Sequence, residues 1–172
     1  MRAGVVVNEK REVKRLGEVC QIDPPKSEAR RKLSSLDNVS FVPMSDLGQG
    51  QKHFEAKQVR KLDEVVGSYT YFADNDVLLA KITPCFEYGK LGIARKLTNG
   101  VGFGSSEYLV LRPSSTLIAD YLYYFLDQDS VRRAGAFVMA GAVGHKRVPK
   151  EFAENLELFI PPIPEQKRIL SS

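Results

Sequence analysis

One short apolar run constrains the fold of this chain more than any other segment. Residues 77–82 read Val-Leu-Leu-Ala-Lys-Ile and follow the turn-prone residues 74–76, Asp-Asn-Asp. The run is too short for a buried helix of normal length, but a strand that is covered on both faces has this length and composition. The sequence therefore predicts that residues 77–82 form the central strand of a sheet.

Further strands are predicted on both sides of this run. Val39, Phe41 and Pro43 alternate along the chain, which favours a strand that ends at the proline, and residues 46–50 have the composition of a turn. Three later segments have strand-like length, namely 91–97, 107–112 and 156–160. Residues 99–104, Asn-Gly-Val-Gly-Phe-Gly, are expected to form a flexible loop between two of these strands.

Helical spacing is clearest in the second half of the chain. A helix is predicted where apolar side chains recur at Ile118, Tyr121, Leu122, Phe125 and Leu126. Ser114 or Ser115 is available to cap this helix, and Gly135 is available to end a continuation. Residues 161–166, Pro-Pro-Ile-Pro-Glu-Gln, have the composition of a helix start, and the helix would reach residue 172 after barely two turns.

The first quarter of the chain is predicted to be less regular. Leu16, Val19 and Cys20 fit one helical face, which the prolines of residues 23–25 must end because proline has no amide hydrogen. Residues 26–32 are expected to form a basic, exposed loop, and residues 51–61 a polar excursion.

The charge of the chain permits a polyanionic partner without requiring one. The formal net charge is +4 over 172 residues, and the 43% hydrophobic content suits one domain with a substantial core. Cys20 and Cys85 form no C-x-x-C pair, which gives a disulfide framework or a structural zinc site little support and favours a reducing cytoplasm. No apolar run approaches the roughly 20 residues that span a bilayer, so no membrane partner is expected.

The motifs that resemble catalytic sites have the wrong residue types or spacing. Residues 23–26, Asp-Pro-Pro-Lys, resemble the motif with which amino-methyltransferases hold a flipped base, but a lysine replaces the aromatic platform, so a proline turn is the better interpretation. Asp76, Glu87 and Lys90 could imitate the metal-binding cluster of a nuclease, but a turn-forming glycine separates the last two. Neither histidine has a recognisable nucleophile nearby, and neither a cofactor nor a metal is predicted.

Residues 141–147, Gly-Ala-Val-Gly-His-Lys-Arg, are the strongest candidate for a contact with nucleic acid. A backbone without bulky side chains can approach DNA closely, while His145, Lys146 and Arg147 offer donors to phosphates or base edges. From composition alone, a solvated loop is an equally good interpretation. Lys90, Arg95 and Lys96 could form a second basic face. For each of them, however, a salt bridge or a contribution to solubility is the better interpretation.

An ordered series of segments resembles the specificity subunits of type I restriction-modification systems. The matching segments are, in order, residues 16–22, 41–47, 77–90, 104–113, 121–126, 144–148 and 158–166. The segment 77–90, Val-Leu-Leu-Ala-Lys-Ile-Thr-Pro-Cys-Phe-Glu-Tyr-Gly-Lys, is the most specific of them. The resemblance covers roughly residues 16–170.

This resemblance implies an α/β, or α+β, fold in which a bent mixed sheet system with a few helices displays loops into the major groove of double-stranded DNA. It also implies that the domain is not an enzyme, reads one half of a bipartite target, and works with methyltransferase and restriction subunits that perform the chemistry. Full subunits of the family usually hold two recognition domains joined by long helices. A second recognition domain, reached through this helical spacer, is therefore expected as a further partner.

Three regions are expected on this basis: a flexible N-terminal arm at residues 1–15, a target-recognition domain at 16–163 and the start of the spacer helix at 164–172. Together with the resemblance, the basic segments predict DNA contacts by Lys81, Lys90, Arg95, Lys96, Ser105, Ser106, His145, Lys146 and Arg147. Two alternatives belong to other functional classes. They are a stand-alone nuclease or methyltransferase fragment, and a protein-interaction domain whose basic residues only confer solubility.

Overall fold

The elements of the fold are seen in a computed structural model, which describes residues 12–141 and 146–172. The strands are β1 (Glu12–Arg15), β2 (Cys20–Ile22), β3 (Asn38–Val42), β4 (Gln58–Lys61), β5 (Thr70–Ala73), β6 (Val77–Ala80), β7 (Leu91–Ile93), β8 (Val101–Gly104), β9 (Tyr108–Pro113) and β10 (Glu157–Ile160). The α-helices are α1 (Leu16–Val19), α2 (Ser27–Lys32), α3 (Leu62–Val65), α4 (Ala119–Leu126), α5 (Asp129–Met139), α6 (Lys150–Asn155) and α7 (Ile163–Leu170), and two 3-10 turns are η1 (Met44–Asp46) and η2 (Thr98–Gly100).

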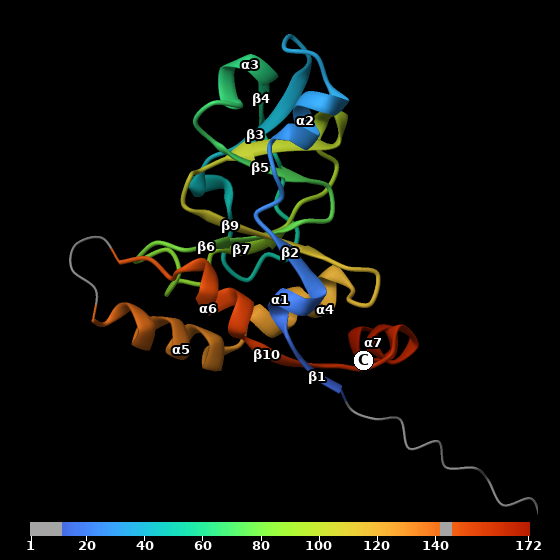
Figure 1. Cartoon of the computed structure of the whole chain (residues 1–172), viewed down its shortest axis with the longest axis vertical. Coiled ribbons are helices and arrows are strands. Elements are labelled where there is room, and N and C mark those ends of the chain that lie inside the picture. Colours follow the sequence, from blue (N-terminus) through green and yellow to red (C-terminus); the bar gives the residue numbers. More distant parts are fainter. Residues whose placement is uncertain (1–11, 142–145) are drawn as a thin grey trace, which may run out of the picture.

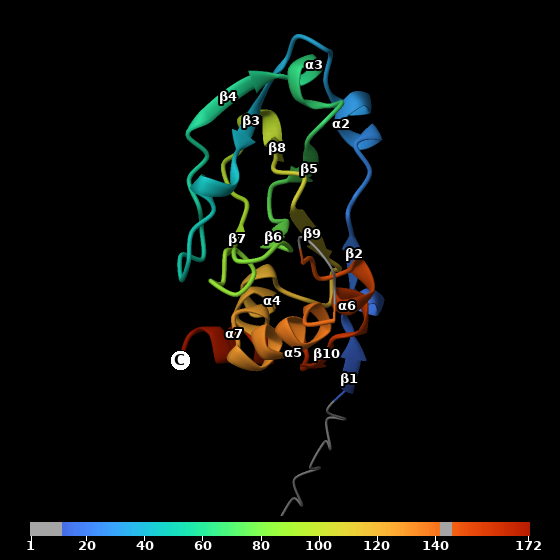
Figure 2. The same ribbon diagram turned by 90° about the vertical axis from the view of Figure 1, so that its left-hand side faces the viewer.

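Two four-stranded sheets stand one above the other along the long axis of the molecule (Figures 1 and 2). The middle sheet has the strand order β2-β9-β6-β7 and is antiparallel throughout. The other sheet, β4-β3-β8-β5, pairs β3 with β8 in parallel and its other neighbours antiparallel; with α2 and α3 it forms what we call the distal lobe. The opposite end of the molecule holds α4 to α7 and the β1-β10 pair. The expected mixed α/β architecture is therefore confirmed.

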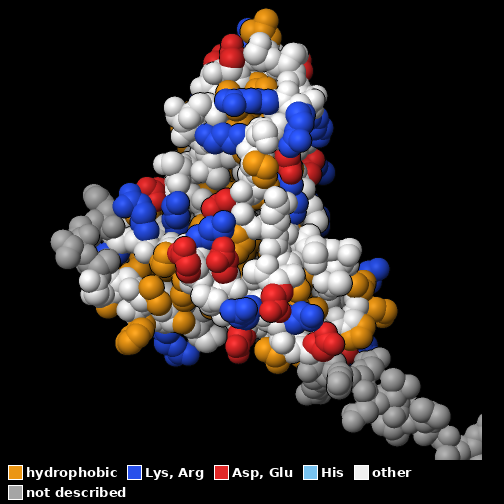
Figure 3. All heavy atoms as spheres, in the orientation of Figure 1, with side chains coloured by type: hydrophobic (Ala, Val, Ile, Leu, Met, Phe, Trp, Pro, Cys, Tyr) orange, Lys and Arg blue, Asp and Glu red, His pale blue; other side chains and the backbone are white. Residues whose placement is uncertain are grey.

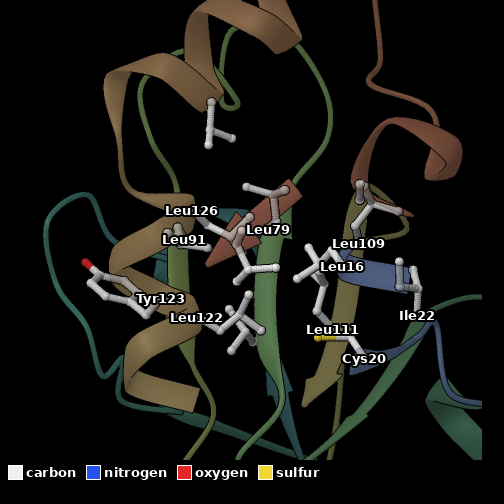
Figure 4. Packing of buried hydrophobic residues seen from close by; sticks show 14 of the residues in the cluster. Leu16, Cys20, Ile22, Leu79, Leu91, Leu109, Leu111, Leu122, Tyr123 and Leu126 are labelled. Atoms are coloured by element: carbon white, nitrogen blue, oxygen red, sulfur yellow. The ribbon is translucent and has the colours of Figure 1, made fainter. Parts of the chain in front are cut away.

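Strand β6 lies in the centre of the middle sheet, as its apolar sequence predicts. Val77 and Leu79 contribute to a core beneath the sheet, whereas Leu78 and Ala80 contribute to a second core between the two sheets. All four side chains are buried because each face of the strand has its own core. Figure 4 shows the lower core, in which side chains of several strands meet those of α4 and residue 16: Leu16, Leu79, Leu91, Leu109, Leu111, Leu122 and Leu126.

The glycine-rich segment 99–104, expected to be a flexible loop, is instead a turn followed by the buried strand β8. A side chain at Gly102 would collide with the ring of Phe72, and one at Gly104 would collide with the carbonyl oxygen of Val42. These glycines therefore permit close packing inside the distal sheet rather than flexibility.

Other local expectations were also wrong. Residues 26–32 contain the helix α2, which packs its buried Ala29 against the distal sheet, and part of the segment 51–61 is the edge strand β4. Cys20 begins β2 rather than continuing the first helix. Gly135 does not end a helix but lies inside α5, where it leaves room for the ring of Phe86.

Both ends of the described chain contact the part of the molecule that holds α4 to α7. Residues 12–15, expected to belong to a flexible arm, form β1 and pair with β10, while residues 1–11 lie outside the described residues. The proline-initiated helix is confirmed as α7. Its buried Gln166 accepts a hydrogen bond from the amide of Ile118, the residue before α4 (2.9 Å), and neither Ser114 nor Ser115 caps this helix. None of the described helices is long and apolar enough to cross a membrane.

Candidate nucleic-acid interface

A cleft opens between the distal lobe and the middle sheet, where the chain passes from one sheet to the other. Its volume is about 370 Å³, and we call it the inter-sheet cleft. Its walls come from the segment before α2, the start of β5, the end of β6 and the turn before β9: Asp23, Pro24, Pro25, Lys26, Ser68, Tyr69, Thr70, Tyr71, Lys81, Ser106 and Tyr108. The cleft thus combines lysines, hydroxyl groups and tyrosine rings, which are side chains able to contact phosphates and base edges.

Several predicted contact residues meet at the end of β6. The amide of Lys81 donates to the carbonyl oxygen of Glu107 (2.9 Å), and the carbonyl of Lys81 accepts from the amide of Val148 (2.9 Å). The amide of Thr83 donates to the carbonyl of Lys146 (2.9 Å), so residues 146–148 run beside residues 81–83. We call this group the β6-end cluster, and it comprises Lys81, Ser105, Ser106, Lys146 and Arg147.

The guanidinium group of Arg147 is held by Glu107. Its Nε and Nη2 atoms donate to the two carboxylate oxygens of Glu107, each at 2.7 Å, and this pairing raises the pKa of Arg147. The arginine side chain is nevertheless 45% exposed. A bidentate pair of this kind fixes the direction of the guanidinium group. It also neutralises part of the positive charge with which Arg147 was predicted to contact DNA. In the same turn, the hydroxyl of Ser105 accepts a hydrogen bond from the amide of Glu107 (3.1 Å).

The remaining predicted residues do not join this cluster. Lys90 lies at the same end of the middle sheet, but its ammonium group donates to the carbonyl of Met44 (3.0 Å). Arg95 and Lys96 follow β7, whose antiparallel register with β6 places them at the opposite end of the sheet. Arg95 lies there 3.7 Å from the carboxylate of Asp120. His145 lies outside the described residues.

The residues that could imitate a nuclease are also separated. Asp76 precedes β6 and is buried against Arg112, whereas Glu87 lies beyond the other end of β6 and accepts a hydrogen bond from the hydroxyl of Thr83 (2.9 Å). No group of three or more His, Cys, Asp or Glu side chains within residues 12–141 and 146–172 is arranged to hold a metal ion. The geometry of the described residues therefore gives this alternative no support.

Sequence reasoning missed Lys26 and Tyr69 as members of the cleft wall. Lys26 was included in a basic loop, but the proline pair before it directs the chain along the cleft into α2. Tyr69 could not be assigned because strand β5, which begins one residue later, carries no alternating polar pattern. The ring of Tyr69, 37% exposed, packs edge-on against Phe41 with 4.8 Å between the ring centroids.

A charged network beside the cleft joins the two sheets. Arg112 of β9 binds Asp76 through its Nε and Nη2 atoms (2.8 and 2.9 Å) and Glu28 of α2 through Nη1 (3.0 and 2.8 Å). The hydrogen bond from Arg112 lowers the pKa of Glu28. Asp76 is only 1% exposed, and this burial raises the pKa of its carboxyl group against the opposing effect of Arg112.

These features define a class of protein: a mixed α/β domain that presents cations and hydroxyl groups around a cleft between two stacked sheets. Two curated relatives from Escherichia coli are the specificity subunits of the type I restriction enzymes EcoEI and EcoAI, with 41% identity over 135 residues and 40% over 136 residues. The aligned regions cover 78% and 77% of this chain but only 23% of each relative. The chain thus spans about a quarter of the length of these relatives.

Solved structures show the same fold. A chain described under "Structural basis underlying complex assembly and conformational transition of the type I R-M system" aligns with a TM-score of 0.63 and 21% identity, over 99% of this chain and 39% of that one. The HsdS subunit from Thermoanaerobacter tengcongensis aligns with a TM-score of 0.60 and 22% identity, over 99% of this chain and 38% of that one. The family model for the type I restriction modification DNA specificity domain matches residues 8–172. The chain belongs to this family, as its ordered motifs predict.

Proposed function

We propose that this domain binds double-stranded DNA with the inter-sheet cleft and the β6-end cluster. In this role it reads one half of a bipartite target and performs no chemistry itself. Methyltransferase and restriction subunits, working with it in the cytoplasm, would act on the DNA that it selects. The observation that carries the proposal is the convergence of Lys81, Ser106 and Lys146 beside a cleft in a chain of the DNA specificity domain family.

In this arrangement, different residues would provide affinity for DNA and preference for a sequence. Lys81 and Lys146 can neutralise phosphates, which gives affinity without sequence preference. Ser105, Ser106 and the fixed guanidinium group of Arg147 can address base edges, because their positions are set by the turn before β9 and by Glu107. Lys90, Arg95 and Lys96 are assigned no base contact in this proposal, since each lies apart from the cluster or is paired elsewhere.

We adjust the domain boundaries expected from the sequence at two points. The recognition domain would begin at β1 rather than at residue 16, because residues 12–15 pair with β10. The spacer helix would begin with α7 at Ile163, and a second recognition domain would attach through it. Gln166 would fix the direction of this helix relative to α4 through its hydrogen bond to Ile118.

The test begins with selection of binding sites from a pool of random duplexes, followed by titrations over a salt series. We expect enrichment of one short sequence and a slope of log affinity against log salt of about minus 2.7 to minus 4.5, if about three to five phosphates each contribute roughly 0.9. The variant Lys81→Gln/Lys146→Gln should weaken binding and flatten this slope. The matched control Arg133→Gln/Lys167→Gln removes two exposed cations from α5 and α7 and should change neither.

Two results would count against the proposal. Equal losses in the two double variants would remove the β6-end cluster from the interface. Cleavage of DNA with Mg²⁺, or methyl transfer from S-adenosylmethionine by the purified chain, would favour a stand-alone enzyme fragment instead.

A further inference from the structure

Helix α2 presents a row of cations that the cleft and the β6-end cluster do not include. Arg30, Arg31 and Lys32 are all exposed, whereas Ala29 is buried in the distal lobe. Figure 3 shows Lys and Arg side chains gathered over the distal lobe on the face that carries α2. This charge is distinct from the predicted contact residues, which belong to the strands and turns below it.

The single acidic residue of α2 does not neutralise this row. Glu28 accepts hydrogen bonds from Nη1 of Arg112 (3.0 and 2.8 Å) and from the hydroxyl of Tyr71 (3.0 Å). Glu28 thus forms its ion pair with Arg112 of the middle sheet, which also pairs with Asp76, and not with a cation of α2. The guanidinium group of Arg31 instead donates within the helix, to the carbonyl and hydroxyl oxygens of Ser27 (3.3 and 3.4 Å). The exposed side of α2 thus keeps its positive charge.

The same contacts fix α2 in place. Through Glu28 the helix is bound to Tyr71 of the distal sheet and to Arg112, which in turn binds the buried Asp76 (2.8 Å). A six-residue helix is too short to hold its own orientation in water, so these tertiary contacts determine where its cations lie. Glu28 and Arg112 are therefore positioning residues for the basic row.

Lys26, one residue before α2, connects this row with the wall of the cleft. Lys26 lines the inter-sheet cleft, and the amide of Arg30 donates to its carbonyl oxygen (3.3 Å), so the two residues lie one helical turn apart on one face. A turn of four residues advances about 6 Å along the helix axis. A polyanion that occupies the cleft would therefore meet Arg30 as it leaves the cleft towards the distal lobe, and Arg31 is the next exposed cation along the helix.

We propose that Lys26, Arg30 and Arg31 bind the phosphate groups of duplex DNA that extends beyond the cleft, and that Glu28 and Arg112 hold them there. This inference rests on the proposed function of the cleft. The contacts set affinity and orientation, whereas sequence preference stays with the residues of the β6-end cluster.

The experiment uses the variant Arg30→Gln/Arg31→Gln in duplex-binding titrations over a salt series. Loss of two phosphate contacts should reduce the slope of log affinity against log salt by about 1.8, since each contact contributes roughly 0.9. The affinity ratio between a selected target and a scrambled duplex should stay unchanged. The control Arg133→Gln/Lys167→Gln makes the same change in net charge away from α2 and should leave the slope as in the original chain.

The outcomes separate this inference from the proposed function. If the original chain shows no salt-dependent binding to duplex DNA, the proposed function fails. If it binds and the Arg30→Gln/Arg31→Gln variant keeps the slope of the control, the α2 contact is wrong while the cleft proposal stands. A loss of sequence preference in this variant would also contradict the inference, because α2 would then read bases.

A second variant tests the positioning role by the sign of its effect. Glu28→Gln removes a negative charge beside the basic row, so charge alone would make DNA binding tighter. Loss of the ionic anchor predicts weaker binding with retained circular dichroism and a flatter salt slope. Tighter binding by the folded variant would overturn the positioning role of Glu28.

Discussion

The ion pair between Arg112 and Asp76 offers a quantitative test of how the two sheets are held together. The variant Arg112→Met removes both hydrogen bonds to a carboxylate that is 1% exposed and leaves it only the amide of Ala73 (2.8 Å). Breaking a buried pair on one side costs about 3–5 kcal/mol, because the remaining charge stays buried without a partner. For a domain of this size, about 2–4 °C is lost per kcal/mol, so the melting temperature should fall by roughly 6–20 °C.

The sign of the pH dependence follows from the two carboxyl groups. Burial already raises the pKa of Asp76, and removal of Arg112 takes away an effect that opposes this rise. The carboxyl group of Asp76 therefore binds a proton more tightly in the folded variant than in the unfolded chain. Its free energy of unfolding should therefore rise as the pH falls from neutral towards 5. The pKa of Glu28 is lowered by Arg112, and the stability that this shift contributes at neutral pH is also lost in the variant. Because of both effects, the loss in free energy of unfolding caused by Arg112→Met should be largest at neutral pH.

Urea unfolding at pH 5 and pH 8 measures both quantities, with Arg133→Met as the control for loss of an exposed arginine. The control should lie within about 0.5 kcal/mol of the original chain. Adding Asp76→Asn to Arg112→Met should restore part of the loss, since the amide keeps an oxygen for Ala73 without a charge. A loss below about 1 kcal/mol in Arg112→Met, or an equal loss at both pH values, would refute the buried-charge reasoning.

Three further predictions concern packing, capping and reactivity. Gly102→Ala should cost about 1–3 kcal/mol in urea unfolding because its Cβ would collide with a buried ring, whereas Gly67→Ala, with open space around it, should be nearly neutral. Gln166→Leu should lower the free energy of unfolding by about 1–3 kcal/mol, since the amide at the start of α4 loses its buried acceptor. Burial raises the pKa of the Cys20 thiol to about 12, so at pH 8 it stays protonated, and iodoacetamide should label Cys85 first and Cys20 only after unfolding. Labelling of Cys20 in the folded chain would contradict its burial.

The sequence predicted elements whose signal lies within a few residues. Strand β6 was found because a short continuous apolar run is typical of a strand that is covered on both faces, and helix α4 because its apolar side chains repeat with the helical period. Strand β8 was missed because two of its four residues are glycines, which suit turns locally. Their role depends on Phe72 and Val42, which lie far away in sequence. Helix α2 was missed for a related reason: this short helix is held in place by Arg112, which also lies far away in sequence.

The candidate site was predictable as a set of residue types but not as an arrangement. Lys81 and Lys146 are brought together only by the pairing of residues 146–148 with residues 81–83, which no local pattern reveals. Arg95 looked equivalent to these lysines in sequence, yet the direction of β7 carries it to the other end of the sheet. Charge identifies candidates, whereas strand register decides which of them can act together.

The burial of both faces of β6 has a consequence for the fidelity of folding. In a strand with one polar face, a slip by one residue would place polar side chains in the core, and this penalty enforces the alignment. Strand β6 lacks that safeguard, because a slipped β6 would still present apolar side chains to both cores. The alignment is set at the end of the strand instead: the buried Asp76, directly before β6, pairs with Arg112 of the neighbouring strand β9 (2.8 Å), and a slip would separate them. One ion pair at the start of β6 thus replaces the polar face that usually fixes the register of a strand.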